Sequence, residues 1–286
     1  MENNYWIVDE WLIFKPTFNE ELTYYYDIIN KYKKIMFSNY DNTLIAIETN
    51  NQYKYEYHNK YYDNYIKSKF NQKINLLNNI NLTHLTFGND FNQEINLLNN
   101  INLTHLIFGY KFNQEINLSN NINLTHLTFG NNFNQKINLL NNVNLTHLTF
   151  KNNFNQEIDL LNNINLTHLT FGRDFNQKIN IPFNIKSLNI HECDNQYIIN
   201  NLHNNIEELI IFKTNLNLDN LPNSIKKLYV NYYDKELNNL PNSIEYLELS
   251  NYELKIKKIP KNLKRVKCDK EYQYINDFKN YEVIYY

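Results

Sequence analysis

A 21-residue segment that recurs almost unchanged limits the folds open to this chain. The triplet Phe-Asn-Gln begins at six positions, each 21 residues after the one before. These positions are Phe70, Phe91, Phe112, Phe133, Phe154 and Phe175. Between them, Leu-Thr-His-Leu recurs five times on the same period, starting at Leu82 and ending with the copy at Leu166. A fixed period of about 20 to 50 residues indicates a stack of equivalent units, each completed by its neighbours.

The apolar spacing inside the repeat predicts one short strand per unit. In residues 82–87 the apolar side chains are Leu82, Leu85 and Phe87, and the last three residues alternate in, out and in. A strand this short cannot bury its apolar side alone, whereas a copy every 20 residues or so builds a parallel sheet over a continuous core. The same LxxLxL spacing continues at intervals of 19 or 21 residues in "IKSLNI", "IEELII", "IKKLYV", "IEYLEL" and "LKRVKC", which start at Ile185, Ile206, Ile225, Ile244 and Leu263.

We therefore expect a β-rich, leucine-rich-repeat-like solenoid: a right-handed stack of ten or eleven coils of 19–21 residues. The returning arm of each coil lacks a helical period, so a second strand, a 3₁₀ turn or irregular backbone is expected there. Its inward side chains are expected to be Phe91, Ile95, Leu98 and Ile101. Asn92 and its equivalents follow each strand, and their amides are expected to stack as a ladder that pairs turn backbone.

The ends of the chain depart from the repeat. Residues 1–57 are expected to form an N-terminal cap of degenerate coils, with a helix between Phe18 and Tyr32, a repeat-like "YKKIMF" from Tyr32 and a strand "TLIAIE" from Thr43. Residues 58–286 are expected to form the solenoid, and "YEVIYY" from Tyr281 is expected to be a last, covering strand.

The motif FNQ(K/E)I…LTHLTFG, with the variants "LPNSIKKL" from Leu221 and "LPNSIEYL" from Leu240, resembles the FNIP repeat. That family belongs to the leucine-rich-repeat-like solenoids and abounds in social amoebae and in the giant viruses that infect amoebae. The resemblance covers roughly residues 61–268. One departure is that the central copies carry "LLNN" where the family has a Leu-Pro step.

Composition excludes several classes of function. Charged residues make up 20% of the chain and the net charge is −2, which gives no electrostatic case for nucleic acid or an anionic membrane. The N-terminus lacks a signal-peptide pattern, and no window approaches the ~18 apolar residues of a membrane span. Cys193 and Cys268 are expected to be free thiols. We expect an intracellular, cytoplasmic protein, in the host cytoplasm if the chain is viral.

Charged residues also fall in columns. A charge follows each Phe-Asn-Gln, at Lys73, Glu94, Glu115, Lys136, Glu157 and Lys178, and only Glu94 and Glu115 are like-charged neighbours. Later strands alternate in sign between consecutive coils, at Lys186, Glu207, Glu208, Lys226, Lys227, Glu245, Lys264 and Arg265. The columns are interpreted as neighbours that neutralise each other, in preference to a charged docking strip.

Histidine occupies one strand position in five consecutive coils and is flanked by threonine. Metal binding would require several ligands that converge on one ion, and catalysis would require a neighbouring nucleophile or acid. Stacking of the imidazoles with threonine methyl groups is favoured, and a recognition surface stays open because such faces bind partners. The candidate partner-binding residues are Thr83, His84, Thr86, Thr104, His105, Thr125, His126, Thr128, Thr146, His147, Thr149, Thr167, His168 and Thr170.

The sequence thus predicts a non-catalytic scaffold for a protein partner, which for a viral chain would be a host protein. No enzyme activity, cofactor, metal, nucleic acid or membrane partner is expected. The alternative is a substrate-recognition adaptor of a ubiquitin ligase, which would need an F-box-like segment within residues 1–57. Because two imidazolium ions about 5 Å apart repel by about 0.8 kcal/mol in water, the column is also expected to lose stability in acid.

Overall fold

The computed structural model describes residues 4–42 and 66–286. It is a parallel-strand β-solenoid, which confirms the expected fold class, and it has about 12 turns where ten or eleven were expected. The chain divides into two compact units, Met1–Leu145 and Thr146–Tyr286, and each unit is described by itself. The strand expected from Thr43 lies outside the described residues.

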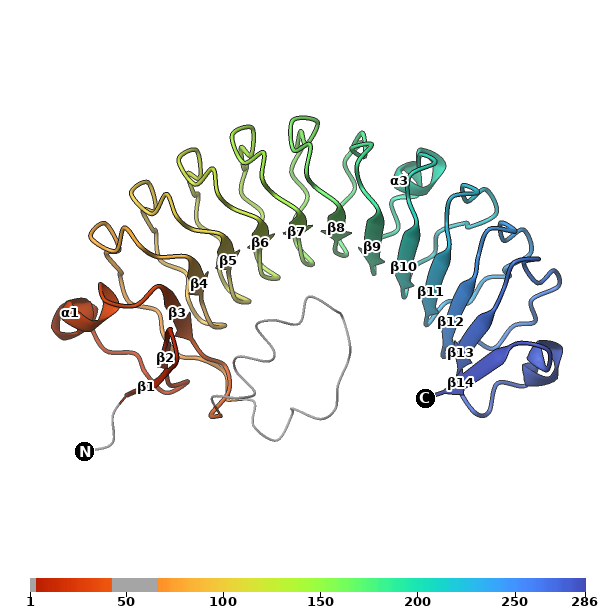
Figure 1. Ribbon diagram of the computed structural model, residues 1–286, viewed down its shortest axis with the longest axis horizontal. Helices are drawn as coiled ribbons and strands as arrows, with labels where there is room; N and C mark the ends of the chain where they lie inside the picture. The colour runs from red at the N-terminus through yellow and green to blue at the C-terminus, as the bar shows by residue number, and fades with distance from the viewer. Residues whose placement is uncertain (1–3, 43–65) are drawn as a thin grey trace. The chain divides into compact units, whose positions relative to one another are not determined.

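In the first unit, consecutive short strands are hydrogen-bonded neighbours in one sheet (Figure 1). Its strands are β1 (Tyr5–Val8), β2 (Trp11–Phe14), β3 (Lys34–Phe37), β4 (His84–Thr86), β5 (His105–Ile107) and β6 (His126–Thr128). All neighbouring pairs are parallel except β1 and β2. The register places His84 opposite His105, so equivalent side chains lie over one another.

The N-terminal residues join this same sheet. The hairpin between β1 and β2 turns at Asp9, whose φ of 51° lies in the left-handed region that Asp tolerates. Two single-turn helices, η1 (Leu22–Tyr25) and α1 (Tyr26–Ile29), occupy the expected helical region. The motif "YKKIMF" supplies β3, which pairs in parallel with β4. Residues 4–42 therefore extend the solenoid and do not form three F-box helices.

The second unit repeats the arrangement with longer strands. They are β7 (His147–Thr149), β8 (His168–Phe171), β9 (Ser187–His191), β10 (Glu208–Phe212), β11 (Lys227–Asn231), β12 (Tyr246–Ser250), β13 (Arg265–Cys268) and β14 (Glu282–Tyr285). The helices of this unit are α3 (Gln196–Asn200) and η3 (Ile275–Phe278). Consecutive strands pair in parallel, and β14, within the expected "YEVIYY" strand, closes the order. Both cysteines are buried and free.

The coils spread apart from the strand face toward the outer side. In the first unit the ring centroids of His84 and His105, on the strand face, are 4.2 Å apart. Phe87 and Phe108, in the core, are 5.6 Å apart, and the Phe91 and Phe112 rings behind them are 6.0 Å apart. The outer segments are therefore spaced more widely than the ~4.8 Å of a hydrogen-bonded sheet. This spacing explains why the outer arm has no second strand.

The returning arm corrects one expectation about which side chains face inward. Phe91 is buried as expected, but Leu98 and Ile95 are only partly buried and Ile101 is 50% exposed. The inward positions belong to Leu97 and Asn100, both 0% exposed. The backbone turns sharply here, and the Asn100 side chain gives buried carbonyls of the preceding coil a second N–H donor, which a leucine or isoleucine side chain cannot supply.

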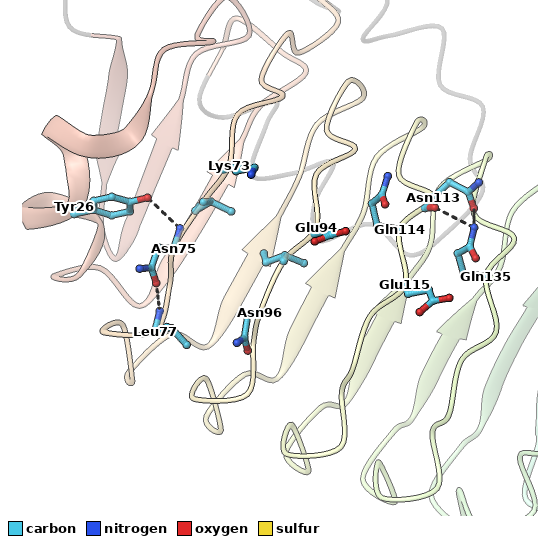
Figure 2. A pocket seen from close by; sticks show the side chains of 12 residues that line it. Tyr26, Lys73, Asn75, Leu77, Glu94, Asn96, Asn113, Gln114, Glu115 and Gln135 are labelled. Carbon is cyan, nitrogen blue, oxygen red and sulfur yellow. Dashed lines mark hydrogen bonds between the residues drawn. The ribbon is translucent and has the colours of Figure 1, made fainter.

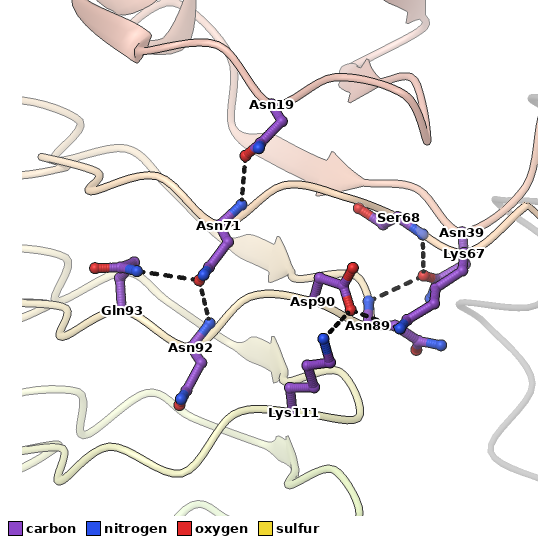
Figure 3. Close-up of polar contacts among 10 residues, drawn as sticks. All are labelled: Asn19, Asn39, Lys67, Ser68, Asn71, Asn89, Asp90, Asn92, Gln93 and Lys111. Atoms are coloured by element: carbon purple, nitrogen blue, oxygen red, sulfur yellow. Dashed lines mark hydrogen bonds and ion pairs between the residues drawn. The ribbon is translucent and has the colours of Figure 1, made fainter.

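Two asparagine ladders run through the coils. In the expected ladder, the Asn92 N–H donates to Asn71 Oδ1 at 2.8 Å, and the Asn71 N–H donates to Asn19 (Figure 3). The second ladder is buried and was not expected. Asn121 Nδ2 donates to the carbonyls of Leu97 and Asn100, at 3.0 and 2.9 Å. Each coil thus supplies donors to the coil before it.

Candidate functional site: the threonine–histidine face

The imidazole rings on the strand face form a stacked column in each unit. His105 lies 4.2 Å from His84 and 4.3 Å from His126, with interplanar angles of 7° and 10°. In the second unit His147 and His168 stack at 4.0 Å. The indole of Trp11 meets His84 edge-on at 5.7 Å, so β2 covers the first ring of the column. The favoured interpretation of the histidines as a cross-strand stack is confirmed.

Hydrogen bonds to the preceding threonines fix the tautomer of these rings. Nδ1 of each ring lies 2.9 Å from Oγ1 of the threonine before it. The Thr104 hydroxyl donates its only proton to the Thr83 carbonyl at 3.0 Å, and Thr83 donates likewise to Lys33. Each hydroxyl must then accept a proton from its histidine. Nδ1 therefore carries the proton, and Nε2 is the acceptor of the neutral ring.

The environment of the column disfavours protonation. Burial, followed by repulsion from His105 and Lys34, lowers the pKa of His84 to about 4. Burial also lowers the pKa of His105, with a further contribution from Lys34. In the second unit burial lowers the pKa of His168, and Glu208 opposes the shift. These shifts favour the neutral form of the three rings near pH 7.

The structure brings the predicted site residues together within each unit, with two departures. Threonine and histidine share one face because Thr86 and Thr128 lie two residues after their histidines. In the middle coil Ile107 replaces threonine at this position. Thr170 is buried, at 8% exposure, and so presents little surface to a partner, whereas His168 is exposed.

The strand face of the second unit continues with residues that were not predicted as site residues. The register places Ser187 opposite His168 and Glu208 opposite Ser187. Further along the sheet, Tyr246 donates to Glu248 at 2.6 Å, and burial raises the tyrosine pKa. The signal was present in "IKKLYV" and "IEYLEL", where lysine, tyrosine and glutamate occupy the threonine and histidine positions.

The two charged columns differ in how they pair. On the strand side of the second unit the expected neutralisation is found, because Glu207 lies 2.8 Å from Lys186 and 2.9 Å from Lys226. Hydrogen bonds from these lysines lower the Glu207 pKa to about 2. The column after Phe-Asn-Gln corrects the expectation. Within either unit, no ion pair joins consecutive members of that column in the described part of the chain. The wider outer spacing accounts for the difference.

The arrangement offers hydrogen bonding and stacking. Within residues 4–42 and 66–286, no group of three or more His, Cys, Asp or Glu side chains is placed to hold a metal ion. The stacked rings direct their Nε2 atoms side by side, whereas metal ligands must converge. Nor does any helix in this part of the chain have the length and apolarity needed to cross a membrane.

Residues 163–193 and 212–252 match the model of the FNIP repeat. The chain carries FNIP repeats in these two segments. No curated protein matches the sequence. Among solved structures, the internalin InlF of Listeria monocytogenes is 21% identical, with a TM-score of 0.50 and coverage of 77% of this chain and 72% of that one. The FNIP-repeat chain therefore shares the leucine-rich-repeat-like fold.

Two further structures are similar to the FNIP-repeat chain at lower scores. CroV588, a circular LRR protein of a giant virus, is 24% identical with a TM-score of 0.42, and the match covers 99% of this chain and 55% of that one. The functional domain of InlJ of L. monocytogenes, which includes a cysteine ladder, is 19% identical with a TM-score of 0.49, and the match covers 70% and 47%. The FNIP-repeat chain thus spans about half the length of these two proteins.

Proposed function

We propose that the protein is a non-catalytic scaffold that binds a protein partner through the threonine–histidine face. The observation that supports this is a rigid column of neutral imidazoles, held by stacking at 4.2 and 4.3 Å and by threonine hydrogen bonds. Such a surface is ordered before binding, so little side-chain entropy is lost on contact. Its partly buried rings present flat apolar area together with acceptor nitrogens, a combination found at protein interfaces.

Affinity capture from amoebal lysate with face variants tests this proposal. His105→Glu combined with His126→Glu places two carboxylates on the face, and we expect recovery of partners to fall at least about tenfold. The matched control is Asn120→Glu, which adds a carboxylate to an exposed turn of the same unit, away from the face, and should leave recovery unchanged. If the two variants recovered partner proteins equally well, or lost them equally, the threonine–histidine face would not be the binding surface.

The ubiquitin-ligase alternative draws no support from residues 4–42, which are built into coils. A truncation of residues 1–57 would also remove β1, β2 and β3, which belong to the sheet of the first unit. The full chain is therefore the form to use for partner capture.

A further inference from the structure

The outer side of the first unit carries a polar depression that the proposed face does not use. Figure 2 shows that it spans successive coils and that Lys73, Glu94 and Glu115 point toward it. Its other lining residues are amide and aliphatic side chains from the same coils, together with Tyr26 from α1. The depression thus faces away from the histidine column.

Glu94 and Glu115 are the only like-charged neighbours of their column, and neither forms an ion pair in the described part of the chain. A comparable depression in the second unit contains Glu207, which is neutralised by lysines on both sides. Two carboxylates on consecutive coils therefore lack the lysine ion pairs that neutralise Glu207. A cationic occupant would complement them.

The backbone under the depression is also open to a ligand. Residues 93–96 and 114–117 neither donate nor accept a backbone hydrogen bond among the described residues, because the coils are too far apart here. In the coil before them, the Asn75 N–H donates to the Tyr26 hydroxyl at 3.1 Å. Among the described residues, the equivalent N–H groups of Asn96 and Asn117 have no such partner. The chain itself thus shows how an acceptor docks on this surface.

Spacing identifies the form of the cationic occupant. The outer rings of these coils are 6.0 Å apart, which sets the separation of equivalent side chains. In an extended peptide, residues i and i+2 lie on one face about 6.6 Å apart. Guanidinium groups at i and i+2 would therefore reach both carboxylates, and the peptide carbonyls could accept from the free N–H groups. Guanidinium is the cation whose planar fork matches a carboxylate.

We propose that this outer depression binds an extended Arg-x-Arg segment of a partner protein, with one arginine on Glu94 and the other on Glu115. The site is separate from the threonine–histidine face, so a protein partner could engage either one alone. Lys73 lies at one end of the depression, where its positive charge would repel a third cationic side chain of the bound segment.

The test uses three peptides of five residues and the full-length protein in 150 mM salt. The probe is acetyl-Ser-Arg-Thr-Arg-Ser amide, and the two comparison peptides are acetyl-Ser-Arg-Arg-Thr-Ser amide and the probe with citrulline in place of arginine. We expect the citrulline peptide to bind at least about tenfold more weakly, and the Arg-Arg peptide, whose side chains point to opposite faces, at least about threefold more weakly. Amide chemical shifts should change at residues 94–96 and 115–117.

Protein variants complete the test. Glu94→Gln combined with Glu115→Gln should weaken the probe at least about tenfold, whereas Glu157→Gln, in the same column beside Lys178, should change its affinity less than twofold. The proposal is overturned if the Arg-Arg peptide binds as well as the probe, if the Gln double variant binds normally, or if the shift changes fall on the histidine face. Displacement of the probe by 1 mM Ca²⁺ would also overturn it, in favour of a simple cation site.

Discussion

Asparagine side chains fill two kinds of position in each coil, and the two differ in burial. Asn120 lies in an exposed turn and donates to the Leu98 carbonyl at 3.1 Å, where water can replace it. Asn121, the next residue, is 0% exposed and donates to two carbonyls of the preceding coil. A buried carbonyl that loses its donor is costly, whereas an exposed one is not. The same residue type is therefore structural at one position and replaceable at the next.

Replacing Asn121 with alanine should lower the free energy of unfolding by about 1 to 2 kcal/mol, because the buried carbonyls of Leu97 and Asn100 each lose one of their two donors and keep only a backbone N–H. The loss is limited because Asn121 Oδ1 has no hydrogen-bond partner among the described residues, so its removal costs nothing. Asn120→Ala should cost less than about 0.5 kcal/mol. Urea unfolding of both variants measures the difference, and equal midpoints would show that the buried ladder does not contribute.

At the scale of elements, each of the five histidine strands contributes one imidazole ring to a stack, and the stack is most stable when its rings are neutral. The coils approach closely at this face, so the His84 and His105 rings touch at 4.2 Å, and the same closeness places their charges together once protonated. Since the folded pKa of His84 lies below the ordinary value of 6.5, the unfolded chain binds protons more readily between about pH 6.5 and 4. Stability must therefore fall as the pH falls through that range.

We expect the urea midpoint of the protein to be lower at pH 5.5 than at pH 7.5. His84 alone should contribute about 1 kcal/mol or less to this loss, after allowance for solvent screening of a partly exposed ring. A variant with glutamine at all five column histidines should lose less stability over the same interval. If native protein and variant respond equally to pH, the column is not the cause.

The strand face could be predicted from the sequence because successive strand residues point alternately inward and outward. This alternation decides which side a residue faces, whatever its side chain is. Leu85 faces inward and His84 outward for that reason alone. The returning arm does not alternate, so hydrophobicity was the only available signal, and it favoured Leu98 and Ile101 over Asn100. The outer spacing that separates Glu94 from its neighbours depends on how whole coils pack, and one coil's sequence does not contain it. The β1–β2 hairpin could not be predicted because it depends on the left-handed conformation of Asp9, which the sequence does not indicate.

At the scale of the whole molecule, stability is spread over nearest-neighbour contacts between coils. A coil touches the one before and the one after it through its strand, its phenylalanines and its asparagines, as the pair of coils with Phe91 and Phe112 shows. Such a structure behaves as a one-dimensional array, in which the free energy of unfolding is close to a sum over units and interfaces.

Removal of one whole period should therefore leave a folded protein. Deletion of residues 91–111 joins equivalent positions of two coils, and we expect cooperative unfolding with a urea m-value reduced by about 7%, the share of 21 residues in 286. Deletion of residues 91–101 removes about half a coil and breaks both the core and the ladders. That variant should lose its cooperative transition in urea, followed by circular dichroism. Two equally stable deletion variants would contradict the additive picture.

The near-identity of consecutive coils has a consequence for how a partner sits on the threonine–histidine face. His84, His105 and His126 lie in the same environment apart from the ends, so a ligand that spans two rings has two equivalent placements in the first unit. Two equivalent placements add a statistical factor to the binding constant. They also let the ligand move by one coil when a substitution removes one placement. In the first unit, alanine at His84 or at His126 would then remove one placement and leave the other, whereas alanine at His105, which both placements share, would remove both.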